Sequence, residues 1–200
     1  RYIASTIWDN KMQNQLQNSD FAVLYRTNAQ SRAIEDALRK RDIPYRIYGG
    51  LSFYQRKEIK DVLSYLRLII NPSDEEALKR IINFPARGIG QTTIDKLIVA
   101  ANGYNKSIFE IIRNLDKVDI GINSGTKTKL DNFATMIASF QVMNQTINAF
   151  ELAEHVTKVS GIIREFNNDG TPEGIARMEN IEELLNGIKD FVEGQKELVD

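Results

Sequence analysis

Apolar residues recur at three- and four-residue spacing from Gly50 almost to the end of the chain, and this periodicity constrains the fold more than any other feature of the sequence. Residues at that spacing lie on one face of an α-helix and bury it against a neighbour. The pattern predicts helices over residues 59–69, 73–83, 91–101, 107–115, 127–148, 151–160 and 172–191. We therefore expect residues 49–200 to form a mostly α-helical domain.

The first fifty residues follow a different pattern. Phe21–Tyr25 is a short apolar run of strand-forming residues, residues 29–41 have the apolar spacing of a helix, and Tyr45–Tyr48 reads as a second strand before Gly49 and Gly50. A strand, a helix and a strand joined by short connections predict a parallel β-α-β unit. Because such a unit needs more strands than these residues supply, we expect residues 1–48 to be part of a larger sheet.

The composition excludes several classes of site. The sequence has no cysteine and one histidine, His155, so disulfides, thiolate metal sites and a histidine-rich metal centre are excluded. His155 lies among apolar residues of a predicted helix, where a surface or core position is favoured over a role as general base. We find no catalytic constellation, no metal site, no internal repeat and no apolar run long enough to span a membrane, and we expect a cytoplasmic protein.

The charge is unevenly distributed although the formal net charge is only −1. Between Arg26 and Arg67, ten Lys and Arg residues face five acids, whereas from Glu151 to Asp200 five basic residues face twelve acidic ones. The small average therefore conceals a basic region that could bind phosphate, followed by an acidic one.

The most informative motif is Pro85–Thr93, a glycine-containing turn between two predicted helices. Glycines expose main-chain N–H groups, and the start of the next helix adds further donors and the positive end of its dipole. Such a turn can bind a phosphate without sequence preference, with Arg87 adding a salt-sensitive contribution. The alternative is that Gly88 and Gly90 only permit a positive φ between packed helices.

Two further constellations could bind nucleic acid. Arg26 and Asn28 follow the first predicted strand, at the end where open α/β sheets usually bind ligands. In the alternative interpretation Asn28 caps the following helix and Arg32 pairs with Glu35 or Asp36.

The second constellation is Phe53–Asp61, which places Arg56 and Lys60 one helical turn apart beside two aromatic residues. The alternative is that the aromatic residues pack inward while the charged side chains form a solvated face of ion pairs, namely Arg56, Lys57, Glu58 and Lys60.

Two segments resemble nucleotide-binding loops but are rejected. Gly88–Thr93 lacks the third glycine of a dinucleotide fingerprint and follows a helix, and Gly121–Thr128 has the wrong glycine spacing for a phosphate-binding loop. The second segment is interpreted as a solvated loop that leads into a helix.

Several segments together resemble DNA helicases of superfamily 1, the family of UvrD, PcrA and Rep. They are Ala22–Arg32, Pro44–Gly50, Phe53–Arg67, Arg87–Gly90, Thr93–Leu97, Arg177–Asn180 and Glu182–Leu184. The resemblance spans nearly the whole chain in the family's order. It implies an ATP-driven motor that moves 3′ to 5′ on single-stranded DNA in repair or replication, with residues 1–48 in the RecA-like domain 2A and residues 49–200 in the helical insertion 2B, which has a helix-hairpin-helix-like turn.

The resemblance also implies roles for particular residues. Arg26 and Asn28 would contact single-stranded DNA, and Gly49 and Gly50 would lie in the hinge between 2A and 2B. The surface presented to the duplex part of a single-strand/double-strand junction would include Arg56, Lys60, Arg87, Gly88, Ile89, Gly90 and Thr92.

The family's ATP- and Mg²⁺-binding motifs are missing from this sequence, so we expect the chain by itself neither to hydrolyse ATP nor to unwind DNA, although the parent protein would use both cofactors. An alternative function is a regulatory module that docks a repair or transcription protein through its acidic segment, without binding DNA by itself.

Overall fold

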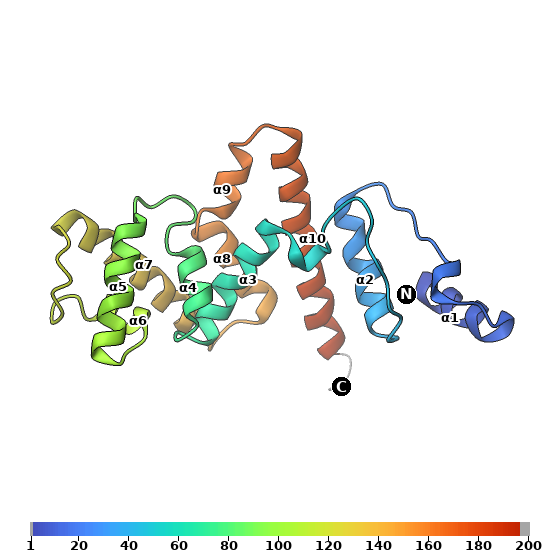
Figure 1. Cartoon of the computed structure of the whole chain (residues 1–200), viewed down its shortest axis with the longest axis horizontal. Helices are drawn as coiled ribbons and strands as arrows, with labels where there is room; N and C mark the ends of the chain where they lie inside the picture. The colour runs from blue at the N-terminus through green and yellow to red at the C-terminus, as the bar shows by residue number, and fades with distance from the viewer. Residues whose placement is uncertain (1, 197–200) are drawn as a thin grey trace. The chain divides into compact units, whose positions relative to one another are not determined.

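The computed structural model describes residues 2–196, apart from the side chains of Asn28 and Lys196, and these residues are mostly α-helical (Figure 1). The α-helices are α1 (Tyr2–Asn14), α2 (Ser31–Arg39), α3 (Lys57–Ile70), α4 (Glu75–Ile81), α5 (Gln91–Tyr104), α6 (Ile108–Arg113), α7 (Ser124–Met143), α8 (Ala149–Val159), α9 (Ile162–Asn167) and α10 (Pro172–Lys196). Short 3-10 helices are η1 (Asn18–Asp20), η2 (Asn28–Gln30) and η3 (Phe53–Gln55).

The chain divides into two compact units. Unit 1 comprises residues 1–60 and 169–200, and unit 2 comprises residues 61–168. The first boundary lies within α3, and the second lies between α9 and α10. These units do not coincide with a division at residue 48, because α10 groups with the N-terminal elements, and the division into 2A and 2B stays a prediction.

Local sequence explains where several helices of unit 2 begin. The side chain of Asp74 accepts a hydrogen bond from the N–H of Ala77, which starts α4. Ser107, Asn123 and Asn148 cap α6, α7 and α8 in the same way. Each cap satisfies an N–H group that has no partner inside its helix, a contribution of about 1 kcal/mol.

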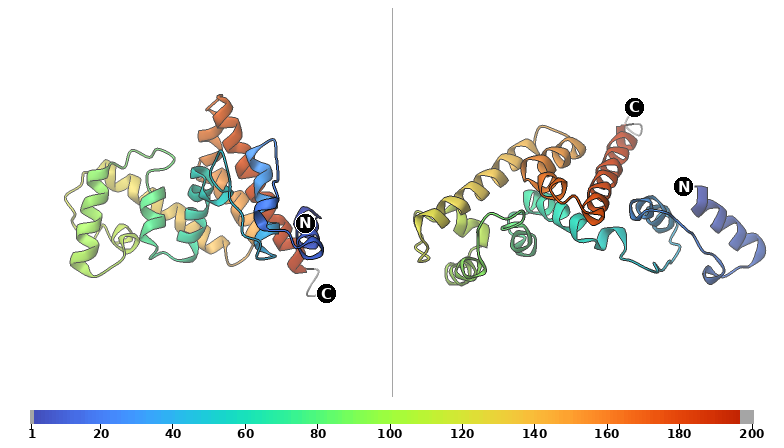
Figure 2. Two further views of the ribbon diagram at one scale, coloured as in Figure 1. Left: turned by 45° about the vertical axis from the view of Figure 1, so that its right-hand side comes forward. Right: turned by 90° about the horizontal axis from the view of Figure 1, so that it is seen from above.

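Unit 2 has an apolar core to which all of its longer helices contribute. Its side chains with at most 1% exposure include Tyr65, Leu78, Ile81, Leu97, Ile112, Leu130, Phe133, Ile137, Phe140 and Val156. The helices predicted from the three- and four-residue periodicity are thus confirmed, and each buries its apolar face. Figure 2 shows the ribbon of the chain from two further directions.

Unit 1 differs from the prediction, because neither Phe21–Tyr25 nor Tyr45–Tyr48 forms a strand, and none occurs elsewhere in residues 2–196. Phe21, Val23 and Tyr45 still pack against a small core made by Ala4, Ile7, Leu38 and Ile43. The two extended segments line a cavity of about 830 Å³ instead of pairing. A strand exists only through its ladder of hydrogen bonds to a neighbour, so apolar packing on one side leaves these segments extended but unpaired.

None of the helices in the described part of the chain combines the length and the apolar character needed to cross a lipid bilayer.

Candidate nucleic-acid interface

The hairpin Gly88–Gly90 joins α4 to α5 in unit 2, and its conformation depends on three features. Gly88 has a φ of +70°, a main-chain angle that residues other than glycine rarely adopt. Ile89 is 1% exposed and anchors the turn in the core. The side-chain oxygen of Asn83 accepts hydrogen bonds from the N–H groups of Arg87 and Ile89, at 2.9 and 3.0 Å. The hairpin is therefore held from inside, with Gly88 and Gly90 exposed.

The start of α5 differs from those of α4, α6, α7 and α8. Its N-cap is Gly90, which has no side chain to accept from the first N–H groups of the helix. The next two residues, Gln91 and Thr92, are exposed. Lys129 of α7 reaches the same hairpin, where its ammonium donates to the carbonyl oxygen of Gly88 at 3.2 Å. The hairpin at the start of α5 thus combines main-chain N–H donors, the positive end of the helix dipole and a lysine ammonium, which are the groups that favour an anion.

Arg87 does not point away from the protein as a free cation. Its Nη1 donates to the carbonyl oxygens of Ile81 (2.9 Å), Phe84 (2.9 Å) and Pro85 (3.2 Å), and its Nη2 donates to the hydroxyl of Tyr65 (2.6 Å) and the carbonyl of Ser160 (3.2 Å). The guanidinium also lies over the rings of Tyr65 and Phe133, at 5.8 and 5.5 Å from their centres. Arg87 consequently acts as an internal brace of the hairpin.

Tyr65 completes this brace from α3. Its hydroxyl accepts from Arg87 and donates to the carbonyl oxygen of Phe84 at 2.6 Å. Burial raises the pKa of Tyr65 to about 12, although the nearby Arg87 guanidinium acts in the opposite direction. The phenol is therefore neutral at ordinary pH and serves as a hydrogen-bonding bridge.

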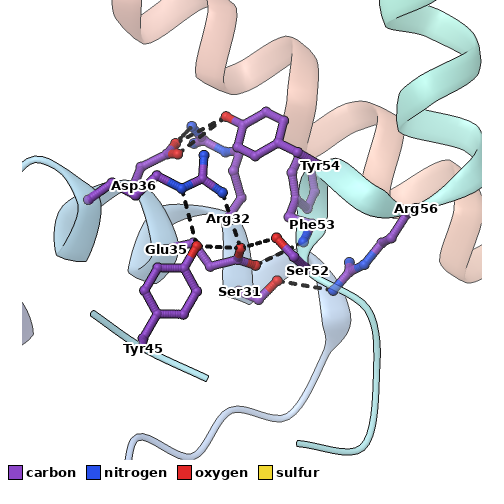
Figure 3. A network of polar contacts seen from close by, with 10 residues as sticks. Ser31, Arg32, Glu35, Asp36, Tyr45, Ser52, Phe53, Tyr54 and Arg56 are labelled. Carbon is purple, nitrogen blue, oxygen red and sulfur yellow. Dashed lines mark hydrogen bonds and ion pairs between the residues drawn. The ribbon is translucent and has the colours of Figure 1, made fainter. Parts of the chain in front are cut away.

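Arg56 occupies a buried network in unit 1 (Figure 3). Its guanidinium donates to Asn180 of α10 at 2.7 Å and to Ser31 of α2 at 3.0 Å, and Asn180 donates to Glu58 at 2.7 Å. Arg56 is 7% exposed and Glu58 is 6% exposed, so the expectation of a solvated ion-pair face at these two positions is wrong. A contact between Arg56 and DNA would require this network to open. Lys60 is exposed.

Glu35 holds the segment after the glycine pair onto α2 (Figure 3). Its carboxylate is buried and accepts from the hydroxyls of Ser52 (2.5 Å) and Tyr45 (2.9 Å) and from the N–H of Phe53 (2.9 Å). Burial alone would raise the pKa of Glu35, but these hydrogen bonds outweigh it and hold the pKa below its ordinary value. The side chain is thus a charged structural anchor.

Basic and acidic segments of the sequence meet in unit 1. Arg32 of α2 pairs with Asp36 at 3.3 Å, as the alternative interpretation predicted, and it also pairs with Glu183 (2.8 Å) and Asp190 (3.7 Å) of α10. Part of the positive charge between Arg26 and Arg67 is therefore neutralised by the acidic C-terminal helix instead of facing solvent.

The remaining predicted residues lie in unit 1. Arg26 is exposed at the rim of the cavity of about 830 Å³. The side chain of Asn28 lies outside the described part of the structure. Gly49 and Gly50 line the same cavity, and Gly49 has a φ of +79° with space for a Cβ at both positions. This conformation is compatible with a hinge, which stays a prediction.

The single histidine and the carboxylates of the described residues offer no candidate metal site. His155 packs edge-on against Phe140 with ring centres 5.8 Å apart, and no group of three or more His, Asp or Glu side chains there could hold a metal ion. Sequence reasoning missed one residue of the hairpin surface, Lys129, because it follows Gly88 by more than a helix and a loop in sequence.

Comparison with known proteins identifies the family. The chain belongs to the UvrD-like helicase C-terminal domain family, whose model matches residues 1–199. Among curated relatives, the ATP-dependent DNA helicase PcrA of Leuconostoc citreum is 39% identical over 190 residues, which cover 95% of this chain and 25% of that protein. PcrA of Bacillus subtilis strain 168 is 40% identical over 173 residues, covering 86% of this chain and 23% of that protein. The chain thus spans about a quarter of the length of these relatives.

Proposed function

We propose that unit 2 binds the sugar-phosphate backbone of duplex DNA through the hairpin at Gly88–Thr92, as part of an ATP-dependent 3′–5′ DNA helicase. The observation that carries this proposal is the start of α5, where no side chain caps the helix and the Lys129 ammonium lies against the hairpin. Backbone N–H groups and a lysine bind phosphate oxygens without reading base edges. A helicase needs this kind of sequence-independent contact, and the relatives are named as DNA helicases.

The proposed contact surface divides the predicted residues by role. Gly88, Gly90 and Thr92 present exposed groups to the phosphates, whereas Ile89 is buried and Arg87 is engaged inside the protein. We assign Arg87 and Ile89 to holding the hairpin in shape.

Contacts to the rest of a single-strand/double-strand junction are proposed for unit 1. Lys60 is exposed in the first turn of α3, and Arg26 is exposed and lines the cavity of about 830 Å³. These residues, with Asn28, would contact the single strand or the junction.

ATP and Mg²⁺ belong to the proposed activity of the whole helicase. The chain corresponds to about a quarter of its relatives' length, and its two glycine segments lack the pattern of a phosphate-binding loop. We therefore assign no step of ATP hydrolysis to its residues.

Docking of a repair or transcription protein is the second candidate function. Exposed acids on α10, such as Glu173, Glu179 and Glu182, could face a basic partner. Neutralising these three residues would weaken partner binding but leave DNA binding by unit 2 intact, which separates the two functions.

The variant Gly90→Asp tests the hairpin directly. A Cβ at Gly90 meets nothing within 4 Å, and its φ of −81° is open to any residue, so the substitution fits. Aspartate is a good N-cap and its charge suits a helix start, so stability should stay equal or rise by about 0.5 kcal/mol. The same carboxylate would satisfy the donors proposed for phosphate and repel DNA.

The experiment measures binding of a labelled duplex with a 3′ single-stranded tail by fluorescence anisotropy at several salt concentrations. Asn148→Asp is the matched control, because it adds the same charge at the N-cap of α8, where the side chain already caps the helix. We expect about a tenfold loss of affinity for Gly90→Asp, at unchanged or higher stability, and little change for the control. Equal affinities for the two variants would refute the hairpin as a phosphate contact.

A further inference from the structure

Unit 2 contains the hairpin sequence twice, contrary to our expectation that the chain has no internal repeat. Residues 88–97 read Gly-Ile-Gly-Gln-Thr-Thr-Ile-Asp-Lys-Leu, and residues 121–130 read Gly-Ile-Asn-Ser-Gly-Thr-Lys-Thr-Lys-Leu. Glycine, isoleucine, threonine, lysine and leucine recur at matching places, so half of the positions are identical. The second copy is the segment that we interpreted as a loop leading into a helix, and it does lead into α7.

The backbone repeats along with the sequence. Gly88 and Gly121 have φ angles of +70° and +65°. The helix-capping residues that follow, Gly90 and Asn123, have φ and ψ of −81° and 165° and of −74° and 163°. The matching leucines, Leu97 and Leu130, are both fully buried. The two segments are therefore two copies of one structural element, a positive-φ glycine followed by a helix.

Each copy donates a hydrogen bond from a lysine of its helix to the glycine carbonyl oxygen of the other copy. Lys96 in the helix of the first copy donates to the carbonyl oxygen of Gly121 in the second copy, at 2.5 Å. Lys129 in the helix of the second copy donates to the carbonyl oxygen of Gly88 in the first, at 3.2 Å. Both lysines are exposed. Contacts in which each member touches the matching atom of the other are the mark of a local two-fold relation.

The two copies differ in whether their main-chain N–H groups already have acceptors within the protein. In the second copy Asn123 already accepts from the N–H of Thr126, and Asp119 accepts from the N–H of Gly121. Those donors are used within the protein, so the positive group at the second hairpin is the Lys96 ammonium. The acids nearby leave both donating lysines available, since Asp116 pairs with Lys127 and Asp95 accepts from Gln91.

We propose that Lys96 and Lys129 form a symmetric pair of phosphate contacts, one for each strand of a DNA duplex. The two strands of a duplex are themselves related by local two-fold axes, and a protein surface with matching symmetry can contact both equivalently. A single strand lacks this symmetry and can engage only one of the two hairpins. This inference rests on the proposed binding of duplex DNA by unit 2 and adds the second hairpin and Lys96 to it.

The test compares Lys96→Gln, Lys129→Gln and the double variant of the full 200-residue chain. The control is Lys79→Gln with Lys158→Gln, two exposed lysines of unit 2 that pair with Glu75 and Glu154 on their own helices. Binding to a blunt 20-base-pair duplex and to one of its strands is measured by anisotropy at 50 to 200 mM salt, and urea unfolding verifies that each variant is folded.

Each single variant should bind the duplex about tenfold more weakly and lower the slope of log affinity against log salt by about one. The duplex affinity of the double variant should fall about a hundredfold, and that of the control should fall less than threefold. Lys96→Arg should retain the duplex affinity of the wild-type chain. Single-strand binding of each single variant should change no more than in the control, because a single strand can engage the hairpin whose lysine remains.

If Gly90→Asp weakens duplex binding but Lys96→Gln resembles the control, the symmetric pair is wrong while the first hairpin stands. If both lysine variants weaken single-strand and duplex binding equally, the assignment of one lysine to each strand is wrong. If Gly90→Asp has no effect, the proposed function itself fails.

Discussion

Replacing Arg87 should destabilise unit 2 rather than merely remove a DNA contact. Two acceptors of the Arg87 guanidinium are buried, the Tyr65 hydroxyl at 0% exposure and the Ser160 carbonyl in a residue at 7% exposure. A hydrogen bond from a charged donor to such a group is worth about 1.5 kcal/mol, so Arg87→Ala should lower the free energy of unfolding of unit 2 by about 3 kcal/mol.

Two signals can separate the units in one urea titration. The only tryptophan is Trp8, which lies in unit 1, so its fluorescence follows that unit. Far-UV circular dichroism is dominated by the helices, most of which lie in unit 2. With a urea dependence of about 2 kcal/mol per molar, the circular dichroism midpoint should fall by about 1.5 M while the Trp8 midpoint stays unchanged.

Arg87→Lys is the informative companion, because a lysine keeps the charge but cannot donate to all the acceptors that the planar guanidinium reaches. We expect it to lose most of the same stability. If both variants unfold at the wild-type urea concentration and bind DNA more weakly, Arg87 is a direct phosphate contact and the brace is wrong.

Three further predictions concern pH and glycine. Between pH 10 and 12, wild-type protein should lose about 2 kcal/mol more stability than Tyr65→Phe, because the unfolded phenol ionises near 10.0 while the folded one keeps its proton up to about 12; equal losses in urea titrations at these pH values would contradict the bridge. Glu35 has a lowered pKa, so its stabilisation is complete above 4.5 and is lost as the pH falls, and acid titration of Trp8 fluorescence should show a steeper loss for wild type than for Glu35→Gln. Gly88→Ala should destabilise unit 2 by about 1 to 2 kcal/mol, because φ is +70° and the new Cβ would lie 2.7 Å from Nζ of Lys129. Gly103→Ala, a helical position with open space, should be neutral or stabilising in the same thermal or urea unfolding assay.

The periodicity of the sequence was sufficient to predict the longer helices of unit 2, because each buries one continuous face. It missed α1, where exposed Tyr2, Ile3 and Met12 obscure the buried face of Ala4 and Ile7, and it missed the six-residue α9. The strand predictions failed for a different reason. Apolar, strand-forming residues specify an extended conformation, but pairing depends on another segment that local sequence does not reveal.

The hairpin was found from sequence because glycines beside a helix start are a local signal. The structural role of Arg87 was not predicted from the sequence. Its acceptors are main-chain oxygens and a tyrosine hydroxyl, which come together only in the folded chain. The burial of Arg56 was not predicted either, because its partner Asn180 is distant in sequence. Long-range partners decide whether an arginine faces solvent or the interior, and a pattern of neighbouring residues cannot contain that information.

The discontinuity of unit 1 has a consequence for how the chain reaches its native state. Its two segments, residues 1–60 and 169–200, meet only after the intervening polypeptide has been brought into a loop, and contacts such as Arg32–Glu183 close it. For an unstructured loop of roughly 100 residues the entropic cost is about 4 kcal/mol. If residues 61–168 fold first, the flexible loop becomes a compact insert, and the entropic cost of bringing the two segments of unit 1 together falls. We therefore expect unit 2 to mature first, with the recovery of Trp8 fluorescence trailing helix formation during refolding.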